Sequence, residues 1–243
     1  MSLIIQELRF QMRHGFGLAY LLVVTVYTAG LHLLPAPLAP WAAAFLLLTD
    51  PMTVGLVFVG GVVQLEGSMQ LVPALFVTPL RPERFLLYRV VSFALLGVAI
   101  ALLLLSLAPA TVYTEAPLGR AGTLGVAVLV TLLASATLTV AGAAVAYAVS
   151  SINGYILAIV PLLFVAALPF LGWIPGLAGA WFFWSPTFLP IYVFGLLFGL
   201  PGVGASTATL VVATLFLAGW GVAAGWAALR MLERRLRLSV GGG

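Results

Sequence analysis

Long runs of apolar residues dominate the chain, and short polar segments separate them. A helix needs about 20 mostly apolar residues to cross a bilayer. The runs are continuous rather than alternating, which excludes a transmembrane β-barrel. The pattern therefore predicts an all-α, polytopic membrane protein with six transmembrane helices, over residues 16–34, a second segment that ends at 66, 85–108, 121–149, 155–171 and 206–229.

The second predicted span has two possible starting points. Asp50 followed by Pro51 is a typical N-cap and first-turn pair, which would start the helix at Pro51 and place Asp50 at the outer membrane boundary. The uncharged run from there to Leu65 is short for a bilayer. The alternative is a helix that begins near Trp41 and kinks at Pro51. We expect Asp50 to act as the N-cap.

Two further segments are apolar without forming a full span. In residues 1–15, Ile4, Leu8 and Met12 recur at helical spacing among charged residues, which predicts an amphipathic helix in the membrane interface. Residues 172–204 are interrupted by prolines and contain three tryptophans and Tyr192, residue types that favour the membrane–water boundary. This pattern predicts short, partly re-entrant external helices, because broken helices are tolerated at membrane depth only against protein or water.

The positions of the charged residues predict the orientation. All ten basic residues are arginine. With six spans, nine of them fall on the side of the two termini, and only Arg120 falls on the opposite side. Because positive residues favour the cytoplasmic side, this asymmetry predicts that both termini are cytoplasmic.

Composition excludes several classes of function. The chain is 63% hydrophobic and 7% charged, too poorly charged for a soluble domain, so residues 1–243 are expected to form one membrane domain. Without cysteine there is no disulfide or thiolate metal site, and without lysine there is no P-loop nucleotide site. Residues 121–229 contain no ionisable Asp, Glu, Arg, Lys or His, whereas ion-coupled transporters usually place such residues within the membrane. The arginines indicate topology rather than a nucleic-acid partner.

An intramembrane enzyme is one alternative. Such an enzyme needs a nucleophile with a base, paired carboxylates or a metal site. No histidine follows His32, no His-Glu metal motif is present, and Ser206 lacks the G-x-S-x-G spacing. We therefore expect neither a catalytic residue nor a metal site.

Residues 66–89, EGSMQLVPALFVTPLRPERFLLYR, form the only substantial loop between spans on the predicted cytoplasmic side. Residues 69–77 are amphipathic enough for a short surface helix. Thr78 and Pro79 would end that helix, and Pro82 followed by Glu83 would start the next one. From the residues alone, this segment could equally be a connection whose charges anchor the membrane boundary.

The order glutamate, glycine, small polar residue and then LFVTPLRPERFLLYR resembles the ABC-2 family of ABC exporter permeases. The likeness is greatest to drug-export members known as fluoroquinolone permeases. In that family a glutamate at the end of the second span leads into a coupling helix, and a threonine or serine before Pro-Leu leads into the third span. Glu66, Gly67, Thr78, Pro79 and Leu80 match this pattern. The family architecture of an amphipathic N-terminal helix, six spans and broken external helices agrees over the whole chain.

This resemblance implies the permease subunit of an ATP-driven exporter in a bacterial or archaeal cytoplasmic membrane. Two permease subunits, identical or different, would pair within the lipid. Each would dock residues 66–84, here called the coupling loop, on a separate ABC ATPase that binds ATP and Mg²⁺, while the permease itself binds no cofactor. The residues expected to couple the two are Glu66, Gln70, Thr78, Pro79, Arg81, Glu83 and Arg84.

The apolar, aromatic character of the spans suits a hydrophobic or amphipathic cargo taken from the cytoplasm or the inner leaflet. Residues that could line the pathway or gate are Asp50, Phe58, Phe164 and Phe170, although a phenylalanine on a membrane helix more often packs or faces lipid. Two other functions stay open. One is a haem-export permease of the cytochrome-maturation type, which shares the six-span plan, and the other is a membrane scaffold or immunity subunit that transports nothing.

Overall fold

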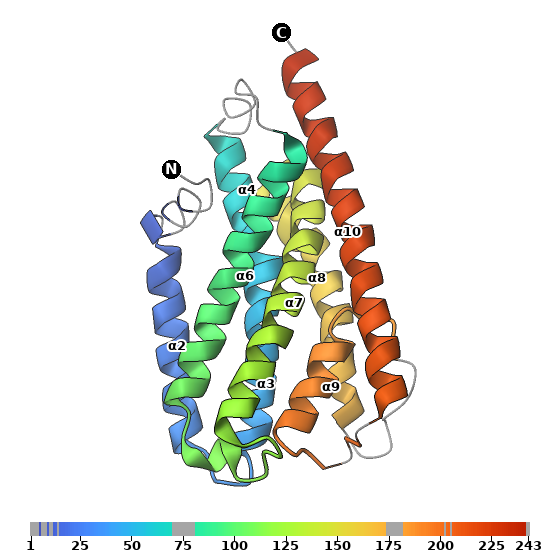
Figure 1. Cartoon of the computed structure of the whole chain (residues 1–243). Helices are drawn as coiled ribbons and strands as arrows, with labels where there is room; N and C mark the ends of the chain where they lie inside the picture. Colours follow the sequence, from blue (N-terminus) through green and yellow to red (C-terminus); the bar gives the residue numbers. More distant parts are fainter. Residues whose placement is uncertain are drawn as a thin grey trace.

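The computed structural model describes residues 5, 9, 12, 13, 15–69, 81–173, 182–201, 203–204 and 206–241. Within these residues every regular element is helical, and the long helices run side by side in one bundle (Figure 1). In chain order the elements are α2 (Phe16–Leu33), α3 (Ala39–Met52), η1 (Thr53–Phe58), α4 (Val59–Ser68), α6 (Pro82–Leu107), η2 (Ala110–Tyr113), α7 (Gly119–Ala148), α8 (Ile152–Ala167), η3 (Leu168–Trp173), α9 (Phe188–Leu197) and α10 (Thr207–Gly241).

Five helical segments of the described chain are long and apolar enough to cross a membrane. This confirms the prediction of a polytopic helical membrane protein. The shorter α2 has 18 residues, a length of about 27 Å, and α9 has only 10 residues. The five long segments are Ala39–Ser68, Pro82–Leu107, Gly119–Ala148, Ile152–Trp173 and Thr207–Arg237.

The second apolar segment is one continuous helix made of α3, η1 and α4. It begins at Ala39, with Pro40 in its first turn, so the prediction that Asp50 is an N-cap at the outer boundary is wrong. Asp50 is the twelfth residue of the helix, and its side chain is buried. The upstream turns are helical because they bury Leu47 and Leu48 almost completely, and this packing outweighs the local capping signal. Pro51 lies inside the helix, two residues before the start of the π-helical η1.

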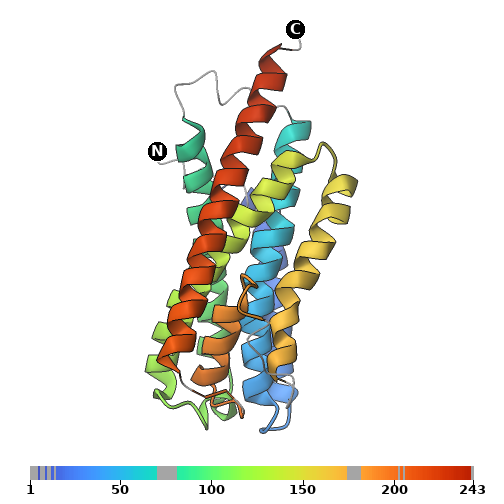
Figure 2. The ribbon, with the colours of Figure 1, turned by 90° about the vertical axis from the view of Figure 1, so that its right-hand side faces the viewer.

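Helix α7 is the centre of the bundle, packed along α6 and α10 and against η1 and α4 (Figures 1 and 2). Its closest approach is to η1, where glycines let two backbones meet. A Cβ atom on Gly55 would lie 2.7 Å from the Thr139 backbone nitrogen, and one on Gly142 would press on the Gly55 carbonyl oxygen. Small residues at such crossings are typical of membrane helix packing.

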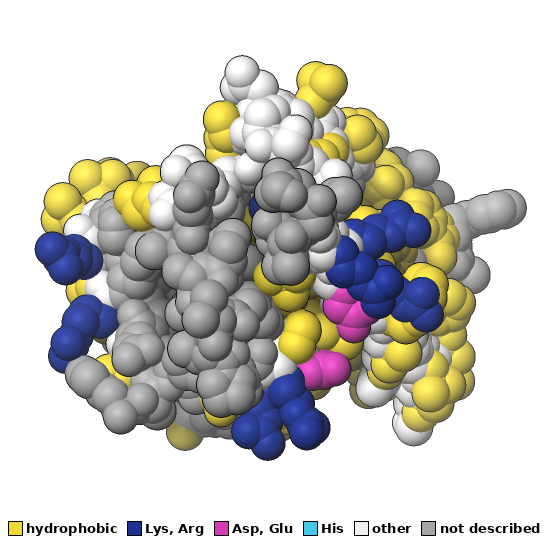
Figure 3. All heavy atoms as spheres, turned by 90° about the horizontal axis from the view of Figure 1, so that it is seen from above, with side chains coloured by type: hydrophobic (Ala, Val, Ile, Leu, Met, Phe, Trp, Pro, Cys, Tyr) yellow, Lys and Arg dark blue, Asp and Glu magenta, His cyan; other side chains and the backbone are white. Residues whose placement is uncertain are grey.

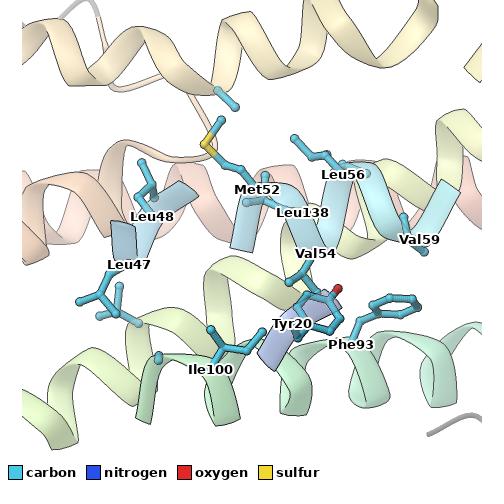
Figure 4. Packing of buried hydrophobic residues seen from close by; sticks show 14 of the residues in the cluster. Tyr20, Leu47, Leu48, Met52, Val54, Leu56, Val59, Phe93, Ile100 and Leu138 are labelled. Atoms are coloured by element: carbon cyan, nitrogen blue, oxygen red, sulfur yellow. The ribbon is translucent and has the colours of Figure 1, made fainter. Parts of the chain in front are cut away.

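The apolar core fills the space between α2, α3, η1, α6 and α7, as the side chains of Tyr20, Leu47, Val54, Phe93 and Leu138 illustrate (Figure 4). The outward faces of α8 and α10 are different. In the most apolar stretch of the α8 segment and of the α10 segment, only 17% is buried inside the protein. The corresponding share for the helix over 39–68 is 61%. These two helices therefore present most of their apolar surface to lipid or to another subunit.

A serine side chain caps the start of α8. The Ser151 Oγ accepts a hydrogen bond of 3.1 Å from the Gly154 backbone N–H. We expect Ser151→Ala to lower the free energy of unfolding by about 1 kcal/mol, because the N–H loses its acceptor. SDS titration in detergent micelles, followed by circular dichroism, measures this change. Ser150→Ala is the matched control, since Ser150 is exposed and does not cap the helix; an equal loss in both variants would contradict the capping role.

Candidate functional site

One end of the bundle gathers most of the charge. Helices α2 and α6 begin there and α4 and α10 end there, and we call it the arginine-rich end (Figure 1). Viewed from this side, arginine side chains lie in groups around the rim (Figure 3). At the opposite end Arg120 donates a hydrogen bond of 2.6 Å to the Ser106 carbonyl oxygen, and its guanidinium lies over the Tyr113 ring. Burial raises the pKa of the Tyr113 phenol, and the positive charge of Arg120 offsets part of that rise.

A buried charge cluster lies just inside the arginine-rich end. The Arg89 guanidinium on α6 donates through Nη2 to Oε1 of Glu66 on α4, and through Nη1 to the Tyr147 hydroxyl on α7 at 2.9 Å. Its Cζ lies 4.7 Å from the centroid of the Phe85 ring. Arg89 is 1% exposed and Glu66 is 5% exposed, so both charges are out of water. The cluster fixes three helices to one another at the point where the coupling loop leaves α4.

Glu66 was identified from the sequence, but Arg89 was missed, because it was used only as one of the arginines that predict the orientation in the membrane. A buried pair of this kind is favourable only when both charges stay hydrogen-bonded, and the loss of one partner is costly. One signal in the sequence could have found it. Phe85, Arg89 and Phe93 follow one another at four-residue spacing, so Arg89 occupies the buried stripe of an otherwise apolar helix.

The structure places the other predicted coupling residues differently. Arg81 is exposed at the N-cap position of α6, and Glu83 and Arg84 are exposed in its first turn. They present alternating charges to solvent, whereas Glu66 faces inward. Gln70, Thr78 and Pro79 lie outside the described residues, as does most of the predicted interfacial helix over 1–15.

A second set of contacts ties α4 and α10 to the end of α7. The Gln64 side-chain amide donates to the carbonyl oxygens of Ala146 at 3.1 Å and Val149 at 3.3 Å, and Arg235 also donates to the Val149 oxygen. These donors satisfy carbonyl groups that a helix C-terminus leaves unpaired, and the arginine charge suits the negative end of the helix dipole. Beside them lies a cavity of about 690 Å³, lined in part by Gln64, Arg235 and Ser151.

The four candidate pathway residues do not converge on one site. Asp50 and Phe58 lie on the same long helix, and the Phe58 ring packs 5.0 Å from Tyr20. Phe170 packs on Phe45 and Trp173 in a separate aromatic group. Phe164 is 72% exposed on α8, where it can meet only lipid or another chain.

Neither the protein-family models nor the curated proteins give a match to this chain. Among the described residues, no group of three or more His, Cys, Asp or Glu side chains could hold a metal ion. The fold thus defines the class, a polytopic helical membrane protein, and the most distinctive chemistry of its described part is the charge cluster of Glu66, Arg89 and Tyr147.

Proposed function

We propose that the chain is the membrane-spanning permease subunit of an ATP-driven ABC exporter with the ABC-2 fold. The observation that carries this proposal is the charge cluster at the root of the coupling loop. Glu66 stands at the first residue of that loop and is bound to Arg89, which in turn is bound to Tyr147. A partner that pushes the loop would therefore move α4, α6 and α7 together, which is the mechanical link that an exporter without its own nucleotide site requires.

The proposed topology has six spans, with α2 as the first and both termini in the cytoplasm. Its support is twofold. Helix α2 begins and α10 ends at the arginine-rich end, as an even number of spans requires (Figure 1). Nine of the ten arginines belong to segments at that end, which is the distribution expected of a cytoplasmic face.

Residues 172–204 would form the re-entrant external region. In support, α9 is a short helix rather than a full span, and its 10 residues cover about 15 Å, half of a bilayer core. Buried Leu189 and Phe194 pack α9 against the rest of the protein, as a broken helix at membrane depth needs.

The partners would be two ABC ATPase subunits, which bind ATP and Mg²⁺, and a second permease subunit. The outward apolar faces of α8 and α10, which include Phe164 and Val222, suit contact with lipid or with that second permease. The cargo would be a hydrophobic or amphipathic small molecule.

Co-expression tests this function directly. The chain, carrying an affinity tag, is expressed together with a candidate ABC ATPase subunit from its own organism and purified in nanodiscs. We expect the ATPase to co-purify, and its hydrolysis rate to differ from that of the isolated ATPase. Purification of the chain alone, with abundant ATPase left in the cell extract, would contradict the proposal.

Charge reversal at the exposed end of the coupling loop should weaken the complex. We expect Arg81→Glu to raise the Kd for the ATPase by about tenfold, because a repulsive charge at the rim of an interface slows association and weakens binding. Titration of labelled ATPase onto nanodiscs measures the Kd. Arg234→Glu is the matched control, since Arg234 is also exposed at the same end but lies on α10. Unchanged affinity in Arg81→Glu would remove this part of the loop from the docking surface.

A further inference from the structure

One carboxyl group lies in the middle of the protein rather than at either end. The Asp50 side chain is 4% exposed, and its Oδ2 has no hydrogen-bond partner among the described residues. The hydroxyl of Tyr20 on α2, also 4% exposed, likewise has none there, and it lies within electrostatic range of Asp50. An isolated buried carboxylate is costly, and ionisable groups within membrane spans usually serve binding or transport.

An apolar groove lies close to this carboxyl along the chain, since one of its lining residues, Leu46, is one helical turn before Asp50. A cavity of about 280 Å³ lies between α2 and α3, with Tyr27 on one side and Ala42, Phe45 and Leu46 on the other. Ala42, Leu46 and Asp50 follow at four-residue spacing, so they share one face of α3. Tyr20 and Tyr27, seven residues apart, share one face of α2. The groove and the two unpartnered polar groups therefore lie along the same seam between these helices.

The surroundings of the seam are aromatic. Tyr27 and Phe45 line the groove. The ring centroids of Phe58 and Tyr20 lie 5.0 Å apart. Aromatic faces attract cations, and an acidic group among aromatic rings is a typical arrangement for recognising an organic cation. In addition, the π-helical η1 begins three residues after Asp50, and π-helical turns occur frequently at functional sites.

No arginine is paired with Asp50 in the described part of the chain. Tyr20 and Tyr27 are the ionisable groups that α2 places along the seam. The remaining ionisable side chains of the elements packed around α3 belong to the two ends of the bundle. They are Glu83, Arg84, Tyr88, Arg89 and Tyr147 at the arginine-rich end, and His32, Tyr113, Arg120 and Tyr192 at the other.

We propose that Asp50 binds the charged group of lipophilic organic cations that enter through the groove between α2 and α3. The carboxyl holds a proton while the site is empty, since an unpaired carboxylate is unfavourable there. When a cation binds, the O–H bond of the carboxyl breaks and the proton leaves to solvent. The carboxylate then pairs with the cation, so the net charge of the site is zero both before and after binding. The inference rests on the proposed function only in naming these cations as the cargo class.

Tetraphenylphosphonium, a permanent lipophilic cation, is the probe for this site. It is titrated into the purified chain in nanodiscs of zwitterionic lipid, in weakly buffered solution at mildly acidic pH, where the empty site is protonated. We expect saturable binding with release of about one proton per bound cation. Asp50→Asn should weaken binding by at least about tenfold and release no proton. Glu115→Gln, which removes an exposed carboxyl at the opposite end from the coupling loop, should behave as the wild type, and neutral triphenylphosphine oxide should release no proton.

A second readout does not depend on affinity. Dicyclohexylcarbodiimide modifies protonated carboxyl groups in apolar surroundings, and mass spectrometry of the labelled chain should find the adduct on Asp50. Tetraphenylphosphonium should prevent this labelling. Leu46→Trp keeps the carboxyl but narrows the groove, so it should retain labelling and lose the cation.

The site is absent if Asp50→Asn binds tetraphenylphosphonium as the wild type does, if binding releases no proton, or if Asp50 is not labelled. All of these measurements use the chain without an ATPase. A negative result in these measurements therefore does not contradict the exporter function. Likewise, a chain that does not associate with an ATPase does not contradict the cation site.

Discussion

Replacement of Arg89 by methionine is expected to lower the free energy of unfolding by about 3–5 kcal/mol, the largest effect of any single substitution considered for this protein. The methionine keeps most of the apolar volume of the side chain. It removes the donors that bind Glu66 and Tyr147, and the Glu66 charge stays in a site where it is 5% exposed. SDS titration in dodecyl maltoside micelles, followed by circular dichroism, gives the free energy.

Two further variants separate this effect from a general loss of charge. Arg84→Met changes an exposed arginine of the same helix and should shift stability by less than about 0.5 kcal/mol. The double variant Glu66→Gln/Arg89→Met removes the stranded charge, so it should be more stable than Arg89→Met alone. If Arg89→Met and Arg84→Met lower the free energy of unfolding by the same small amount, Arg89 does not hold the three helices together.

The second large effect is expected at the crossing of η1 and α7. A methyl group at position 142, introduced by Gly142→Ala, would press on the Gly55 carbonyl oxygen and lie 2.6 Å from Cγ1 of Val59. A backbone oxygen can yield only if the two helices move apart, so we expect a loss of about 1–3 kcal/mol in the same unfolding assay.

Gly125→Ala is the matched control on the same helix, since nothing lies within 4 Å of a Cβ atom at that position. Because alanine favours the helix over glycine, this variant should gain about 0.5–1 kcal/mol. Opposite signs for the two substitutions would establish close backbone packing at Gly142. Changes of the same sign and size would show that the crossing tolerates a side chain.

Apolar run length predicted much of the fold, because a continuous run of helical length has few other ways to satisfy its backbone in lipid. All-α architecture and the long segments over 82–107, 119–148 and 207–237 follow from it. The start of the second span does not follow from run length. Asp50 and Pro51 carry a strong local signal for a helix start, but the preceding turns bury Leu47 and Leu48, and that tertiary contact decides the boundary.

The candidate site was predictable only in part, for a similar reason. Glu66 was identified from its place in a family-like sequence, whereas its environment depends on Arg89 and Tyr147, 23 and 81 residues further along the chain. No local pattern states which residues of different helices face one another. The same limit applies to Phe164, whose outward position on α8 depends on how the bundle packs.

Site-directed cross-linking is the most direct test of the claim that this chain docks an ATPase through its coupling loop. The natural chain has no cysteine, so a single introduced thiol reports one position. Glu83→Cys places that thiol on the exposed start of α6, and Glu115→Cys places it at the opposite end of the bundle. With a candidate ABC ATPase subunit co-expressed in native membranes, a thiol-reactive cross-linker should join the thiol at position 83, and not the one at position 115, to the ATPase. Absence of a cross-link from position 83, or equal cross-linking from both positions, would contradict the account.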